Sequence, residues 1–286
     1  SEISTEDAAV LMETLMQEMR RGGYEFYTGT SYRHLLIHKF GSVVELTAPH
    51  DILTKRIGEY LPQDAVLREM METSYRILSN HPLNLERKAK GLNPANSVWF
   101  WGAGTRPMLT SFEEKYHKKG AMISAVDLLK GIAVGAGLDN IIVEGANGGL
   151  HTNYTGKAEA AVDALAAQDY DFVYVHIEAP DEMGHQGSIP DKIKAIENID
   201  QKIIGPIVGE MEDLCMDFRT LVLPDHPTPI CVRTHTGNPV PYLLYDSRKK
   251  AEGMPEYSER LGNKSPLFEK EGHRLLSRLF EMDNER

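Results

Sequence analysis

The sequence predicts an α/β protein: a mostly parallel sheet with helices on both faces, preceded by a smaller α+β domain. From residue 96 onward, short apolar runs alternate with amphipathic helical patterns, which is typical of strands joined by helical crossovers. Residues 1–95 mix strand and helix patterns, and the connecting stretch 87–96 is rich in Gly, Asn and Pro. We therefore expect two domains, 1–95 and 96–286.

The elements of the first domain follow from apolar spacing. Residues 4–19 are patterned as an amphipathic helix, with Ser4 and Asp7 placed as a capping pair. Residues 25–40 and 41–49 are expected to form strands around Gly41. A second helix is expected over 64–80, ending at His81-Pro82.

The second domain repeats a strand, a loop and a helix. Strands are expected at 97–101, 121–126, 140–145, 171–177, 220–224 and 241–245, and helices over 124–137, 157–168 and 191–214. The carboxyl ends of parallel strands meet at one edge of the sheet, and ligands collect at that edge.

Charge and composition exclude several classes of partner. The net charge is −11, with no Lys/Arg-rich run, which argues against nucleic acid or an anionic membrane as a partner. No apolar stretch approaches the length of a membrane span, and the first residues do not read as a signal peptide. Two cysteines are too few for a disulfide framework, so we expect a cytoplasmic protein.

Polar residues follow the expected strands. The pairs Asp181/His185 and Asp225/His226 each come directly after an apolar run, and His235 lies nearby. Imidazole and carboxylate groups suit zinc, manganese or iron, and carboxylates also let magnesium compete. The alternative is that each histidine caps a helix or forms a loop hydrogen bond. Five such residues after successive strands favour a two-metal site, an arrangement suited to phosphoryl transfer.

Other residues have two readings each. Lys130, just past a strand end, could reach a phosphate or be a solvated helix lysine. The glycines of 145–149 could bind an anion through backbone N–H groups or form a plain tight turn. In the first domain, Arg33 and Arg87 are candidate substrate contacts, against the alternative that they are ordinary surface residues.

The motifs "VHIEAPDEMGH", "LVLPDHPTP", "HTGNPVPYLLYD", "GAMISAVDLLKGI" and "TNYTGKAEAAVDAL" resemble the archaeal-type 2,3-bisphosphoglycerate-independent phosphoglycerate mutases of the alkaline phosphatase superfamily. The resemblance runs from residue 3 to the end. It implies an alkaline-phosphatase-like core with two divalent ions, manganese first and zinc or magnesium as alternatives. It also implies a cap over the small-molecule substrate, phosphoglycerate, and no need for 2,3-bisphosphoglycerate.

The activity implied is that of a glycolytic isomerase, which interconverts 3-phosphoglycerate and 2-phosphoglycerate through a phosphoserine. Matched position by position, Asp181, His185 and His235 resemble the ligands of one metal, and Asp225 and His226 part of the other set. Lys130 resembles the lysine that contacts the phosphoryl group. Arg33 and Arg87 are matched loosely to substrate contacts of the cap.

The chain also departs from the family pattern. The family's first strand, ending in Asp-Gly, and the following loop with the nucleophilic serine have no counterpart here. We therefore expect an N-terminally truncated mutase that is inactive by itself, with an exposed sheet edge that could pair in a homo-oligomer. The alternatives are another phosphatase or phosphotransferase of the superfamily, or a metal-binding fragment without catalysis.

Overall fold

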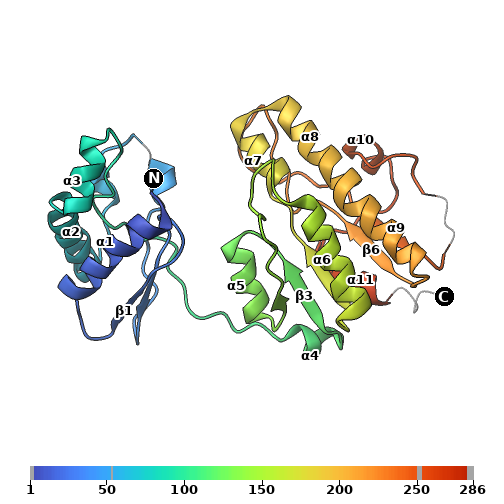
Figure 1. The fold of residues 1–286 in the computed structure, drawn as a ribbon, viewed down its shortest axis with the longest axis horizontal. Helices are drawn as coiled ribbons and strands as arrows, with labels where there is room; N and C mark the ends of the chain where they lie inside the picture. The colour runs from blue at the N-terminus through green and yellow to red at the C-terminus, as the bar shows by residue number, and fades with distance from the viewer. Residues whose placement is uncertain (1–2, 53, 250–252, 282–286) are drawn as a thin grey trace. The chain divides into compact units, whose positions relative to one another are not determined.

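The structure of the protein is a computed structural model that describes residues 3–52, 54–249 and 253–281 (Figure 1). The chain forms two compact units, Ser1–Arg106 and Pro107–Arg286. The boundary expected near residue 95 falls inside the first unit, and the assignment of residues 1–95 as a cap stays a prediction.

The first unit packs helices against a two-stranded hairpin. Its elements are α1 (Thr5–Glu18), β1 (Tyr24–Tyr27), β2 (Leu35–His38), the short helices η1 (Pro49–Ile52) and η2 (Ile57–Tyr60), α2 (Ala65–Ser79) and α3 (Pro82–Ala89). Ser4 caps α1 as the spacing predicts, because its side chain accepts the backbone N–H of Asp7 at 3.1 Å. Phe26 and Leu36 are paired across the antiparallel hairpin, and both pack on the core of α1 and α2.

Two predicted strands of the sequence analysis are wrong. Residues 41–48 and 97–101 form no strand, although both are rich in apolar residues. Val98 and Phe100 pack on the core of the first unit, and Trp99 Nε1 donates to the carbonyl of Thr47 at 2.7 Å. The stretch 97–101 therefore belongs to the first unit rather than to the sheet of the second.

The second unit contains a three-stranded parallel sheet of order β4-β3-β5 (Figure 1). Its first half contains α4 (Phe112–Tyr116), β3 (Gly120–Ile123), α5 (Asp127–Gly135), β4 (Asp139–Asn140), α6 (Tyr154–Ala167) and β5 (Phe172–Val175). The central strand β3 is buried along its whole length, as a strand covered on both sides must be. The predicted α/β fold class is confirmed, with helical crossovers joining the parallel strands.

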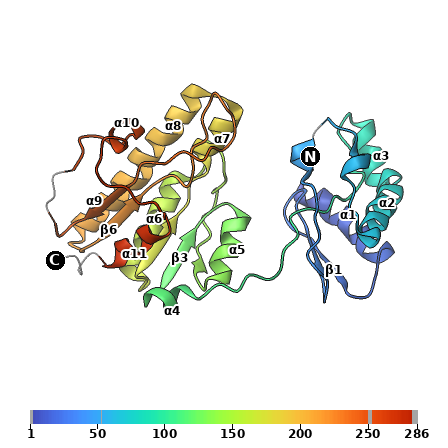
Figure 2. The same ribbon diagram turned by 180° about the vertical axis from the view of Figure 1, so that it is seen from behind.

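Side-chain alternation in β5 shows how both faces are covered. Phe172 stacks on Phe112 of α4 at 4.9 Å between ring centroids, and it meets Phe280 of α11 edge-on at 5.6 Å. Val175, which points to the opposite face, packs against the core that α6 forms with α7 and α8. In Figure 1 α6 lies in front of the strands, whereas Figure 2, from behind, shows α11 in front.

The rest of the second unit is helical, with one antiparallel strand pair. It comprises α7 (Ala179–Gln186), α8 (Ile189–Ile199), the π-helical turn η3 (Asp200–Ile204), α9 (Gly205–Asp213), β6 (Arg219–Val222), β7 (Leu243–Asp246), α10 (Glu259–Gly262) and α11 (Arg274–Glu281). β6 and β7 pair antiparallel with each other, so the expectation of parallel strands does not extend to them. The π turn ends two residues before Pro206, which has no N–H to give to a helical carbonyl.

Candidate metal centre

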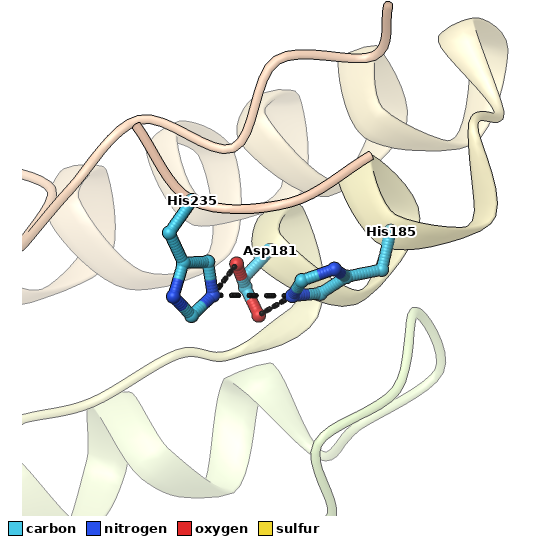
Figure 3. A group of neighbouring side chains, drawn as sticks. All are labelled: Asp181, His185 and His235. Atoms are coloured by element: carbon cyan, nitrogen blue, oxygen red, sulfur yellow. Dashed lines mark hydrogen bonds and ion pairs between the residues drawn. The ribbon is translucent and has the colours of Figure 1, made fainter. Parts of the chain in front are cut away.

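Three of the predicted ligands converge on one point. Asp181 and His185 lie one turn apart on α7, which places them on the same helix face. His235 comes from the loop after β6, and ligand atoms of the three residues lie within 4.8 Å of one another. Figure 3 shows the Asp181 carboxylate between the two imidazole rings.

The contact distances define which atoms face each other. His185 Nε2 lies 3.1 Å from His235 Nε2 and 3.3 Å from Asp181 Oδ2. His235 Nε2 is also 3.3 Å from the other carboxylate oxygen, Oδ1. The carboxylate thus presents one oxygen to each histidine.

The hydrogen bonds of His185 show that a cation fits this group. Its Nδ1 lies 3.0 Å from the backbone carbonyl of Arg233, which can only accept, so Nδ1 carries the hydrogen. In the neutral ring Nε2 then presents a lone pair toward the Asp181 carboxylate, and these two facing acceptors repel each other. A divalent ion ligated by two imidazoles and a carboxylate removes that repulsion, and a carbonyl behind a ligating histidine is the usual support.

Asp225 and His226 lie in the same region. The ring of His226 packs on the ring of His235 with 3.7 Å between centroids. Asp225 Oδ2 is 3.4 Å from His226 Nε2, so these adjacent residues also turn ligand atoms toward one point. The Asp225 side chain is 74% exposed, which leaves room for further ligands.

Ser124 and His176 occupy the ends of the parallel strands next to these ligands. The strands β3 and β5 end in register, and Ser124 Oγ lies 3.3 Å from His176 Nδ1. Burial, reinforced by the charge of Lys157, lowers the pKa of His176 against the opposing influence of Asp225 and Asp181. The imidazole therefore lies within the electrostatic field of both proposed ligand sets.

Lys157 is a candidate residue that the sequence analysis missed. It is 1% exposed, and its Nζ donates to the backbone carbonyl of His176 at 3.1 Å. Burial lowers the pKa of this ammonium, while the negative charge of Glu178 opposes that shift. The spacing could have revealed it, because Lys157 falls within the buried stripe of α6 that includes Tyr154, Ala158 and Ala161.

The glycine-rich loop 145–149 is largely occupied by its own hydrogen bonds. The N–H of Asn147 donates to Thr152 Oγ1 at 3.0 Å, and that of Gly149 to Asn147 Oδ1 at 2.9 Å. The carboxylate of Glu178 lies so close to Gly148 that a Cβ there would stand 2.0 Å from its Oε2. These features support a tight turn packed on Glu178 rather than a cradle for an anion.

The remaining predicted site residues have local partners. Lys130 Nζ pairs with Asp127 at 3.3 Å, one turn earlier on α5. In the first unit, the Arg33 guanidinium lies over the Tyr32 ring. Arg87 is 6% exposed and binds Asp7 at 2.7 Å, which links α3 to α1. Substrate contacts by these three residues stay predictions.

The comparisons with known proteins define the class. The family description "Metalloenzyme superfamily" matches residues 10–275. The 2,3-bisphosphoglycerate-independent phosphoglycerate mutase of Methanosarcina barkeri is 49% identical over 91% of this chain and 67% of its own length. A probable mutase of this kind from Geobacter sulfurreducens is 43% identical over 98% of this chain and 70% of its own length.

Two solved structures have a fold similar to that of this chain. The PH0037 protein of Pyrococcus horikoshii covers 100% of this chain, and the chain covers 71% of it, with a TM-score of 0.78 and 28% identity. The cofactor-independent phosphoglycerate mutase of Thermoplasma acidophilum shares the fold, with a TM-score of 0.58 at 24% identity over 97% of this chain and 69% of its own.

The chain is thus a member of the metalloenzyme superfamily. Within it, the chain belongs to the family of 2,3-bisphosphoglycerate-independent phosphoglycerate mutases, as its motifs predict. The relatives are named as mutases, which are isomerases. This chain spans about two thirds of their length.

Proposed function

We propose that the protein containing this chain interconverts 3-phosphoglycerate and 2-phosphoglycerate with divalent metal ions and without 2,3-bisphosphoglycerate. The observation that carries the proposal is the convergence of Asp181, His185 and His235, whose facing acceptor atoms suit a cation. Asp225 and His226 are proposed to contribute to a second site, and Mn²⁺ is the proposed ion at both. When bound, such ions stabilise charge on the attacking and leaving oxygens of a phosphoryl group.

Within this proposal Lys157 joins Lys130 as a candidate for the cation that contacts the phosphoryl group. The Lys157 ammonium donates a hydrogen bond to the backbone carbonyl of His176, which directly follows β5. Lys130 forms an ion pair with Asp127. The Lys157 ammonium is held in a buried position before substrate arrives, so orienting it costs little reorganisation during transfer.

The phosphoserine step and the expected inactivity of these 286 residues alone stay predictions. So do a homo-oligomer, a role in glycolysis and a cytoplasmic location. Among the described residues, no helix combines the length and apolarity needed to span a membrane.

The proposed activity is tested on the metal-stripped protein that contains this chain, because these 286 residues alone are expected to be inactive. The formation of 2-phosphoglycerate is coupled to enolase. Activity is expected to require added Mn²⁺ and to proceed without 2,3-bisphosphoglycerate. His185→Ala should reduce it at least ~100-fold, since a ligand is lost, whereas His273→Ala, at an exposed position of the same unit, should not. Chelator-resistant turnover, or equal activity of the two variants, would contradict the metal-dependent mechanism.

A further inference from the structure

Thr228 contacts one residue from each proposed ligand set. It follows Asp225 and His226 in the loop after β6, and only 4% of its surface is exposed. Its Oγ1 lies 2.5 Å from Asp181 Oδ1 and 3.3 Å from His226 Nδ1. Asp181 belongs to the triad with His185 and His235, and His226 to the other proposed site.

The chemistry of the three groups fixes the direction of both hydrogen bonds. An ionised carboxylate can only accept, so the single hydrogen of the Thr228 hydroxyl goes to Asp181. The hydroxyl oxygen then accepts a hydrogen from His226, which must carry it on Nδ1. In neutral His226 the lone pair is consequently on Nε2, the atom that lies 3.4 Å from Asp225 Oδ2.

The backbone around Thr228 is held from the other side. Lys192 of α8 donates to the Thr228 carbonyl at 2.6 Å. Gly184 of α7 makes this approach feasible, because a Cβ there would stand 2.6 Å from the same carbonyl oxygen and 2.9 Å from Lys192 Nζ. The backbone of Thr228 is thus held by contacts with α7 and α8 as well as by its own loop.

We propose that Thr228 is a positioning residue that couples the two metal sites. A single hydroxyl orients the carboxylate of Asp181 in one site and selects the imidazole tautomer of His226 in the other. The inference rests on the proposed metal-dependent function and extends it to a residue that is not itself a ligand. Removing the hydroxyl leaves the Asp181 oxygen and the His226 ring without the group that orients them, so both sites should weaken together.

Three variants separate the hydroxyl from the shape of the side chain. Thr228→Val removes the hydroxyl at nearly constant volume, and Thr228→Ser retains it. Thr236→Val is the matched control, because the buried Thr236 Oγ1 has no hydrogen-bond partner among the described residues although it neighbours His235. Calorimetric titration of the metal-stripped proteins with Mn²⁺ should show about 10–100-fold weaker binding for Thr228→Val, the range for loss of a ligand's supporting group. Thr228→Ser and Thr236→Val should bind like the wild type.

A second readout reports the tautomer directly. Long-range ¹H–¹⁵N correlation spectra of the metal-free wild type should show His226 protonated on Nδ1, with the signal assigned through a His226→Gln variant. Thr228→Val should lose this preference and Thr228→Ser should keep it. A wild-type His226 protonated on Nε2 would overturn the proposal, as would unchanged Mn²⁺ binding by Thr228→Val.

The outcomes distinguish this inference from the function on which it rests. A wild type that binds no Mn²⁺ overturns the proposed metal centre, whatever the tautomer. A wild type that binds, with a Thr228→Val that binds equally, overturns only the role of Thr228. If Thr228→Val fails to fold, the wild-type tautomer and the behaviour of Thr228→Ser still decide the matter.

Discussion

Asp246 anchors the strand pair from which the loop with Asp225 and His235 emerges. Its side chain is 1% exposed and accepts from Arg219 Nε and from Arg248 Nε and Nη2, each at 3.0 Å. Arg219 in turn donates to carbonyls at the end of α11. The carboxylate therefore joins β6, β7 and α11 through one buried charge.

Asp246→Asn should destabilise the second unit substantially. Removing one partner of a buried charge cluster costs about 3–5 kcal/mol. We expect a destabilisation at the lower end of this range, because Arg248 is 39% exposed and asparagine retains one accepting oxygen. A loss of about 3 kcal/mol corresponds to a fall in Tm of about 6–12 °C for a unit of this size. Urea denaturation followed by far-UV circular dichroism measures it, with the exposed Asp217→Asn as a control that should change stability by less than about 0.5 kcal/mol.

The pH dependence gives the sharper test. Hydrogen bonds from Arg248 foremost, and from Arg219, hold the pKa of Asp246 well below its usual value against the opposing effect of burial. A carboxyl whose pKa is lowered by folding adds stability above its unfolded pKa of about 3.9, and that contribution is lost as the pH falls further. The difference between wild type and Asp246→Asn should thus be constant from pH 5 to 8 and shrink below about pH 4. A difference under about 1 kcal/mol at pH 7, or one that does not shrink in acid, would refute this reasoning.

Three further predictions concern the metal centre and its support. Lys157→Met should lower kcat about 100-fold by removing a preorganised charge, with Mn²⁺ affinity unchanged in calorimetry; an equal fall in affinity would place Lys157 in the metal site instead. His185→Ala should abolish the tighter of two Mn²⁺ binding events, because the triad has three protein ligands and the other site has two; loss of the weaker event would reverse the order of the sites. Gly184→Ala should cost about 1–3 kcal/mol in thermal denaturation, since its Cβ would meet the Thr228 carbonyl. Gly209→Ala in α9, where a Cβ meets open space, should instead gain up to about 1 kcal/mol, and a loss of similar size in both variants would show that the contact is irrelevant.

Local patterns predicted the regular elements better than their pairing. The helix at residues 4–19 was predicted because its apolar spacing and its Ser4 cap are local properties. Residues 97–101 are apolar because Val98 and Phe100 pack, partly buried, on the core of the first unit, yet no segment among the described residues forms a ladder with them. Alternation records a half-buried extended chain, whereas a strand also needs a hydrogen-bonded partner, which depends on distant parts of the sequence.

The position of Asp181 and His185 could be predicted from topology, because both follow the parallel strand β5. Strands that run parallel end at one edge, so Asp181 and His185 could be expected near other strand-end residues without knowledge of packing. His235 follows β6, which pairs antiparallel with β7, so parallel topology does not account for its place in the triad. Lys157 could not be found in this way, because lysines on helices are mostly solvated and its importance depends on which face of α6 is buried. Thr228 was hidden as well, since its proposed role depends on a hydrogen bond to Asp181, which lies on α7 and far from it in the sequence.

The two histidines of the triad are 50 residues apart in the chain. An ion held between His185 and His235 would act as a reversible cross-link around α8, α9 and β6. A covalent bond that closes a loop of this span lowers the conformational entropy of the unfolded chain. In the chain-entropy treatment this stabilises the folded state by about 4 kcal/mol. A protein cleaved by a protease between α7 and His235 should therefore keep its two pieces together while Mn²⁺ is present and release them more readily in a chelator. The metal ion would then hold two segments of the polypeptide together as well as take part in its chemistry.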